Sequence, residues 1–208
     1  NEAIPSDELN GMVQLVPEEI FDYSKEEATR DAIVKAFNHL GYADVNVRAV
    51  RNADYDTHVV DVKFEITEGR LYHVRKVLIS GNEMTKDKVI RRELAIHDDD
   101  PLDPSMIEVS KQRLLGMGYF NKVEAYSTNT DAVDSKDVRF EVEEKDAYTL
   151  GVGAEFSDVN SLAGMVSVTN NNFDLFNPGN YFIGGGQRLR LAGVLGFRGG
   201  GADVNFSE

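Results

Sequence analysis

Four aspartates lie close together in the middle of the chain and are the first candidates for metal chemistry. They fall in residues 98–103, which read Asp-Asp-Asp-Pro-Leu-Asp. Carboxylate oxygens suit Ca²⁺, but a calcium-binding loop needs ligands at alternating positions and a glycine at its sharp turn, and this run has neither. A solvated loop with a helix cap is the better interpretation, and a contact with a partner protein is the alternative.

The other residue types that could do chemistry are scattered. The chain has no cysteine, which excludes thiol nucleophiles and cysteine-bound metals. Residues 184–186 are three glycines, but no strand–loop–helix pattern surrounds them and no Lys-Ser/Thr follows, as a phosphate-binding loop requires. No Gly-x-Ser-x-Gly motif is present. The four histidines share no ligand spacing: His39, His58, His73 and His97. The sequence therefore predicts no enzyme, no metal site and no cofactor.

Charge and hydropathy narrow the class of protein further. The chain has 208 residues, with 36 acidic and 22 basic side chains and a net charge of −14. Nucleic-acid binding needs clustered Lys and Arg to neutralise phosphates, so nucleic acid is excluded as a partner. No apolar run reaches the roughly 18 residues that a transmembrane helix needs. The length allows two small domains or one of medium size.

The first 147 residues show two passes of one pattern. In the first pass, a capping box at Ser24 and Glu27 predicts a helix, and alternating apolar residues over 45–66 predict a hairpin. The second pass predicts a strand over 77–79, a Gly-Asn turn, a helix capped by Thr85, a helix from Asp103, and a hairpin over 123–142. Each pass is therefore β-α-α-β-β, a three-stranded sheet covered by two helices, and the first and third strands are expected at the sheet edges.

The two passes align at three places. Residues 1–2 match 82–83, residues 40–42 match 117–119, and residues 64–68 match 140–144. In this alignment the first pass lacks its opening strand, so we expect the chain to be a fragment of a longer protein. The predicted domains are 1–70 and 71–147.

The pattern changes at Tyr148. Twelve of the 18 glycines lie from Gly151 onward, and apolar residues alternate with small or polar ones in four stretches. Strands of about ten residues with one apolar face are typical of transmembrane β-barrels, although a soluble antiparallel sandwich also alternates. Arg188 and Arg190 on the non-apolar face favour the barrel. Residues 148–208 are therefore predicted to be about four strands of a transmembrane barrel, too few to close it. The fold class is α+β.

These stretches carry a family resemblance. Residues 77–82 (Val-Leu-Ile-Ser-Gly-Asn), 89–94 (Val-Ile-Arg-Arg-Glu-Leu) and 114–120 (Leu-Leu-Gly-Met-Gly-Tyr-Phe) look like a POTRA domain. The Gly-Val-Gly strand at 151–153 and the segment 172–179 (Asn-Phe-Asp-Leu-Phe-Asn-Pro-Gly) resemble the barrel start of the BamA-type outer-membrane protein assembly factors. The resemblance implies two periplasmic POTRA domains, the first without its opening strand, followed by strands of an incomplete barrel in the bacterial outer membrane.

The resemblance also implies partners and contact residues. The family inserts unfolded outer-membrane proteins without ATP, and its first barrel strand pairs with incoming strands. Here these residues are Tyr148, Leu150, Gly151, Val152, Gly153 and Phe156. We expect the two glycines to ease opening of that edge. An accessory periplasmic lipoprotein is expected at Asp98 and Asp99, and outer-membrane lipid around the strands.

The sequence also allows two alternative functions and predicts one further property. The chain could belong to a polypeptide-secretion pore of the same superfamily, or it could be a soluble periplasmic adaptor with a β-sandwich tail. An isolated fragment is expected to self-associate through its barrel strands, because an uncovered strand edge is a template for pairing. The segment from Asn170 to Gly186 is longer than expected for a connection between adjacent strands.

Overall fold

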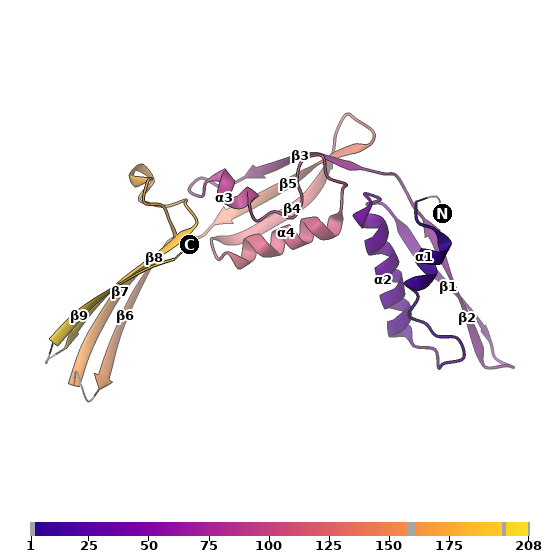
Figure 1. The fold of residues 1–208 in the computed structure, drawn as a ribbon, viewed down its shortest axis with the longest axis horizontal. Coiled ribbons are helices and arrows are strands. Elements are labelled where there is room, and N and C mark those ends of the chain that lie inside the picture. The colour runs from indigo at the N-terminus through magenta and orange to yellow at the C-terminus, as the bar shows by residue number, and fades with distance from the viewer. Residues whose placement is uncertain (1–2, 158–160, 197–198, 208) are drawn as a thin grey trace. The chain divides into compact units, whose positions relative to one another are not determined.

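The structure is a computed structural model that describes residues 3–157, 161–196 and 199–207. Its residues form two compact units, which are described separately. The first comprises the described residues of 1–77, 96–108 and 126–138, and the second comprises those of 78–95, 109–125 and 139–208. Figure 1 shows the order of the elements along the chain. No helix among the described residues is long and apolar enough to cross a membrane.

The first unit begins with two helices, α1 (Ser6–Gly11) and α2 (Tyr23–His39). The N-cap of α2 is Asp22, whose carboxylate accepts the backbone N–H of Ser24 at 2.8 Å. The predicted cap at Ser24 is therefore wrong. The Ser24 hydroxyl donates to the same carboxylate at 2.7 Å, so it supports the cap rather than providing it. An ionised carboxylate is a strong acceptor for the free N–H groups of a first helical turn.

The predicted hairpin follows as β1 (Asn46–Asp54) and β2 (Val59–Thr67), which pair antiparallel from Asn46↔Thr67 to Asp54↔Val59. An ion pair ties β1 to α2, because the guanidinium of Arg51 donates to both carboxylate oxygens of the buried Glu26 at 2.6 and 2.7 Å. The buried core of this region comes from the loop before α1, both helices and β1: Ile4, Leu9, Ile33, Phe37 and Val47.

The second helix–sheet region contains β3 (His73–Ser80), α3 (Asp87–Arg91), α4 (Pro104–Gly116), β4 (Phe120–Asn129) and β5 (Ser135–Glu144). Its strand order is β3-β5-β4, and α4 lies along the sheet in Figure 1. The third strand of the pattern is therefore central, and the expectation that it forms an edge is wrong. The edges are β3 and β4, because β5 returns between them.

Helix starts in this region differ in how well the sequence predicts them. The carboxylate of Asp103 accepts the N–H of Ser105 at 2.7 Å, so the predicted cap of α4 is confirmed. The N-cap of α3 is Lys86, without a side-chain cap bond, so the predicted cap at Thr85 is wrong. Thr85 is buried and uses its polar groups elsewhere, as described below.

Four antiparallel strands complete the second unit: β6 (Tyr148–Ser157), β7 (Ser161–Phe173), β8 (Gln187–Gly196) and β9 (Gly199–Ser207). They lie in chain order, β6-β7-β8-β9, and the sheet is open. The α+β class and the open antiparallel sheet that the sequence predicts are confirmed.

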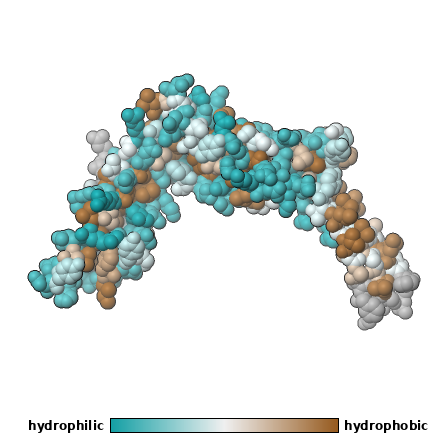
Figure 2. All heavy atoms as spheres, turned by 180° about the vertical axis from the view of Figure 1, so that it is seen from behind, coloured by the Kyte–Doolittle hydropathy of each residue, from teal (hydrophilic) through white to brown (hydrophobic). Residues whose placement is uncertain are grey.

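The register of these strands builds two different faces. One row across the sheet is Leu150, Val168, Leu191 and Val204, which are all exposed. The next row is Thr149, Thr169, Arg190 and Asn205. Because side chains alternate between faces, these rows point to opposite sides. One face is therefore apolar and the other polar, and Figure 2 shows the hydrophobic side chains gathered on this sheet.

Candidate functional site

The candidate strand-pairing site lies along β6, at one end of the four-stranded sheet. Its backbone pairs with β7 from Tyr148↔Asn170 to Ser157↔Ser161, and within the described residues no strand lies on its other side. Leu150 and Val152 are 69% and 77% exposed, so this edge carries apolar side chains outward. An open backbone edge flanked by apolar side chains can accept another extended chain.

The two glycines of β6 differ in what surrounds them. A Cβ at Gly151 would lie 2.6 Å from the Ser167 hydroxyl, whereas a Cβ at Gly153 would meet only Met165 at 3.6 Å. Gly151 thus permits close packing of β6 against β7, whereas there is room for a side chain at Gly153. For Phe156 the structure describes the backbone pairing with Leu162 but not the side chain, which lies outside the described residues.

Asp98 and Asp99 lie in a loop against β3, in the first unit, whereas β6 belongs to the second unit. The carboxylate of Asp98 accepts the backbone N–H of Val77 at 2.7 Å. The N–H of Asp99 donates to the Val74 carbonyl at 2.8 Å, with a positive φ of 68° at Asp99. The structure therefore gives Asp98 an internal partner, although the side chains of both residues remain exposed.

This loop, residues 98–102, covers much of the outer edge of β3. The Val74 N–H donates to the carbonyl of Asp100 at 2.8 Å, and the Leu102 N–H donates to the carbonyl of Tyr72 at 2.9 Å. His73 and Pro101 also form an isolated antiparallel bridge. Together with the Asp98 carboxylate, these contacts occupy backbone groups that an incoming strand would need.

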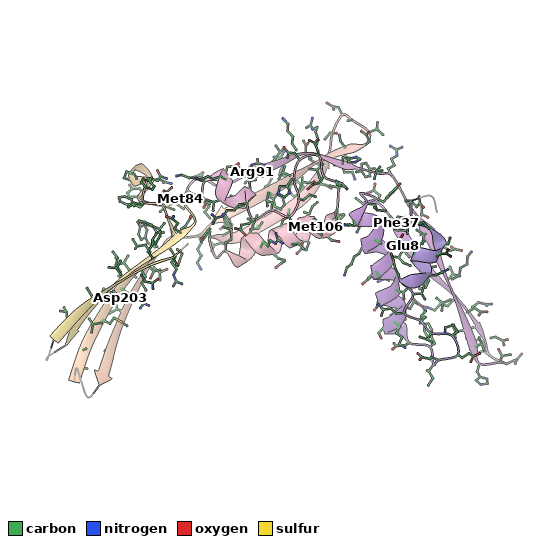
Figure 3. All side chains as sticks on the ribbon, in the orientation of Figure 1. Glu8, Phe37, Met84, Arg91, Met106 and Asp203 are labelled. Atoms are coloured by element: carbon green, nitrogen blue, oxygen red, sulfur yellow. The ribbon has the colours of Figure 1, made fainter. Side chains whose placement is uncertain are left out.

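A second group of contacts joins the end of β7 and the long segment that follows it to the region before α3, within the second unit. The Asn172 amide donates to the Thr85 hydroxyl at 2.8 Å, and its oxygen accepts the Gly186 N–H at 2.8 Å. The Asn180 amide donates to the Met84 carbonyl at 3.3 Å, and Met84 is labelled beside this segment in Figure 3. We call residues 170–186 the docking segment, which contains the short 3-10 turn η1 (Pro178–Asn180).

The backbone of the docking segment also contacts this region directly. The Lys86 N–H donates to the Gly184 carbonyl at 3.1 Å. Gly184 has a φ of 112°, and a Cβ there would clash with the Met84 carbonyl oxygen, so only glycine fits. The Tyr119 hydroxyl donates to the Gly186 carbonyl at 2.9 Å, and burial raises the pKa of Tyr119.

One ion pair completes this contact. The Lys86 ammonium bonds the carboxylate of the buried Asp174, and this bond holds the pKa of Asp174 below its usual value. The Thr85, Asn172 and Asp174 contacts were missed by sequence reasoning. The unusual length of residues 170–186 and their polar side chains were the available signal.

Among the described residues, no group of three or more His, Asp or Glu side chains is arranged to hold a metal. Three of the four aspartate carboxylates of 98–103, those of Asp98, Asp100 and Asp103, accept backbone N–H groups. The carboxylate of Asp100 accepts the His97 N–H at 2.8 Å, and Asp103 caps α4 and lies 3.2 Å from the ring nitrogen of His39.

Comparison with known proteins defines the class. The POTRA family, described as "Surface antigen variable number repeat", matches residues 1–69 and again 72–145. The chain therefore belongs to the POTRA family.

The particular relatives are outer membrane protein assembly factors. The chain is similar to BamA of Neisseria meningitidis, with 28% identity over 85% of this chain and 22% of the relative. It is also 28% identical to BamA of Nitratidesulfovibrio vulgaris, over 80% of this chain and 21% of the relative. The resemblance to BamA-type assembly factors is confirmed, and the chain spans about a fifth of the length of these relatives.

A solved structure shows that the fold extends beyond the POTRA domains. The crystal structure of BamA from Haemophilus ducreyi lacking POTRA domains 1–3 matches 98% of this chain and 37% of that chain, with a TM-score of 0.83 and 22% identity. The shared fold therefore includes the four-stranded sheet as well as both helix–sheet regions.

Proposed function

We propose that this chain acts in the assembly of outer-membrane β-barrel proteins. Its helix–sheet domains lie in the periplasm, and β6 to β9 contribute to a barrel wall in the bacterial outer membrane. The relatives named as outer membrane protein assembly factors support the general role. The role is non-enzymatic, because it consists of pairing and releasing strands. An apolar face on one side of the sheet supports contact with lipid.

The observation that carries the mechanism is the uncovered edge of β6. We infer that this edge templates an incoming strand of an unfolded barrel protein, with main-chain hydrogen bonds supplying affinity. The side chains that flank the paired strand are Tyr148, Leu150 and Val152. We also expect the isolated chain to self-associate through this edge.

The second helix–sheet region receives substrate on β4 rather than on the covered part of β3. Loop 98–102 already bonds β3 between Tyr72 and Val77, whereas β4 is the other edge of the same sheet. An accessory lipoprotein contact is proposed at this loop. The Asp98 carboxylate bonds Val77, so the exposed Asp99 carboxylate is the better candidate for direct contact.

The test is site-specific crosslinking in outer membranes that carry the protein. A photo-crosslinking residue at Val152 should capture the terminal strand of a barrel substrate. Val166 is a matched control, because it faces Val152 across the β6–β7 pair, is similarly apolar and 52% exposed, but is not on the edge. Capture at Val166 equal to that at Val152 would contradict strand templating by β6.

A further inference from the structure

A pocket of about 390 Å³ lies between α3 and the docking segment, within the second unit. Its walls include Lys86, Lys88 and Arg92 on one side, and Asp174 and Phe176 on the other. The pocket thus combines three cations with one carboxylate and one aromatic ring.

The cations of this pocket stand out against the charge of the chain. Residues 86–92 carry four basic side chains and one acidic one, while the whole chain has a net charge of −14. The fourth, Arg91 of α3, is labelled in Figure 3; it is not among the residues that line the pocket, and it bonds Asp87 at 2.6 Å. A local excess of positive charge in an acidic protein points to an anionic ligand.

Not all of these cations are neutralised by the protein. Lys86 is paired with Asp174. The Arg92 guanidinium lies 3.3 Å from the Glu93 carboxylate. A Cβ built at Gly186 would lie 2.9 Å from the Arg92 guanidinium, so the Arg92 side chain packs against the docking segment. Lys88 is exposed, and no ion pair to it is found within the described residues. The pocket therefore retains positive charge that an anion can neutralise.

The docking segment exposes apolar side chains at and near the pocket. Phe176, which lines the pocket, is 89% exposed, and the neighbouring Leu175 is 58% exposed. Tyr181 is 77% exposed. The hydroxyl of Tyr148, the first residue of β6, donates a hydrogen bond to the Tyr181 carbonyl at 2.6 Å. Exposed aromatic side chains at one end of membrane strands are typical of the level where lipid headgroups meet the acyl chains.

The aromatic side chains at this end of the sheet form a connected group. Phe173 at the end of β7 stacks on Phe182, with ring centroids 6.2 Å apart, and meets Phe206 of β9 edge to face at 6.3 Å. The apolar face of β6 to β9 therefore continues into the docking segment, and the cationic pocket lies directly beside it. Cations beside such a belt match the position of lipid phosphates.

We propose that Lys88 and Arg92, with Phe176 as an apolar anchor, bind the phosphate headgroup of an anionic phospholipid in the periplasmic leaflet of the outer membrane. The inference rests on the proposed function, which places β6 to β9 in that membrane. Lys86 positions the docking segment through Asp174 rather than binding lipid itself. A bound headgroup would tie α3 to the membrane surface at the point where the strands enter it.

The experiment uses the absence of tryptophan from the chain. Phe176→Trp places one fluorophore at the pocket, and the full chain is added to vesicles of phosphatidylcholine alone or mixed with phosphatidylglycerol, each brominated near the headgroup. We expect stronger binding and stronger quenching in the anionic vesicles. Lys88→Gln and Arg92→Gln should each weaken anionic-vesicle binding about fivefold, since a basic residue near an anionic surface contributes about 1 kcal/mol.

Matched variants separate charge from folding. Lys88→Arg should keep the binding, and Lys35→Gln, at an exposed lysine on α2, should have no effect. Equal binding by the Lys88→Gln and Lys35→Gln proteins would overturn the headgroup site. So would full competition by millimolar inorganic phosphate, which indicates a site for free phosphate. The protein could instead bind polyglutamate through Lys88 and show no preference for anionic vesicles. That result would assign the pocket to an acidic protein segment and would also overturn the headgroup site.

A second fluorophore position keeps this inference distinct from the proposed function. The Val152→Trp protein reports on insertion of β6 through quenching by lipids brominated deep in the acyl chain. Quenching in the Val152→Trp protein, with no charge dependence in the Phe176→Trp protein, overturns the headgroup site alone. Absence of deep quenching in the Val152→Trp protein contradicts the membrane placement on which both proposals rest.

Discussion

The edge strands β3 and β6 differ in what covers them. The outer edge of β3 is bonded by loop 98–102 over residues 72–77, through backbone groups and the Asp98 carboxylate. The outer edge of β6 has no such cover within the described residues. Natural proteins cover sheet edges because free edges pair with other chains. The contrast indicates that pairing is prevented at β3 and left available at β6.

The faces of the two sheets differ in the same way. Phe140 of β5 is fully buried, whereas Leu150 of β6 is 69% exposed. Burial of apolar area stabilises a fold only if the area leaves water on folding. The helix–sheet region therefore depends on its own core, and the four-stranded sheet depends on its surroundings.

The largest expected effect tests this difference in faces. Phe140→Ala should lower the free energy of unfolding by about 3–5 kcal/mol, because it removes a buried ring and leaves a cavity. Leu150→Ala is the matched variant on the exposed face, and its cost should stay within about 0.5 kcal/mol. Chemical denaturation in detergent measures both. Similar losses in the two variants would show that the faces are not energetically distinct.

The strand β1 provides a third edge, tied to α2 by side chains. Glu26→Gln should lower stability at neutral pH by about 1.5–3 kcal/mol, the range for hydrogen bonds to charged groups. The hydrogen bonds from Arg51 outweigh desolvation and hold the pKa of the Glu26 carboxyl below its usual value, with smaller help from Arg30. A depressed carboxyl pKa stabilises the fold above the unfolded pKa, near 4.3, and this contribution is lost as the pH falls through the folded pKa.

The pH dependence provides the measurement for this pair. The stability difference between the unchanged protein and Glu26→Gln should be constant from pH 7 to about 5 and shrink below about 4.3. Glu27→Gln is the control, since Glu27 lies on the same helix and only approaches Arg30, at 3.9 Å. A difference that grows on acidification would contradict the assigned direction of the pKa shift.

The docking segment is held mainly by side chains, whereas loop 98–102 is held mainly by backbone hydrogen bonds. Asn172→Ala removes the bonds to Thr85 and Gly186 from a buried site. Unsatisfied buried groups cost about 1–3 kcal/mol, so amide exchange should accelerate at Gly186 and at the neighbouring Gly184. Asn171→Ala is the control, because only the backbone of Asn171 forms a bond here, to Ala147. Unchanged exchange in Asn172→Ala would show that the amide does not hold the segment.

How much of this the sequence could predict depends on whether a feature is local. Alternation with period two is local, so the strands and the two faces of β6 to β9 followed from the pattern. Strand order is not local, and the return of β5 between β3 and β4 was missed. The Asp98–Val77 bond joins residues 21 positions apart and the Asn172–Thr85 bond residues 87 apart, and no short-range pattern encodes either. Thr85 looked like a helix cap because its hydroxyl suits either role.

The smallest effect tests the cover of β3 itself. Asp98→Ala removes one acceptor from the Val77 N–H but leaves the backbone bonds of Asp99, Asp100 and Leu102 in place. The loss of stability should be only about 0.5–1.5 kcal/mol. Amide exchange at Val77 should accelerate about tenfold, since about 1.4 kcal/mol corresponds to a factor of ten, while Val74 stays protected.

The conservative variant decides between an internal and an external role for Asp98. Asp98→Asn keeps an oxygen that can accept the Val77 N–H, so it should restore slow exchange there, although it removes the charge. If Asp98→Asn preserves slow amide exchange at Val77 but abolishes binding of an accessory lipoprotein, the charge of Asp98 also contributes to that binding. If Asp98→Asn and Asp98→Ala accelerate exchange equally, the carboxylate covers β3 through its charge rather than through one hydrogen bond. In either case β6, which has no such cover within the described residues, provides the reference for an open edge.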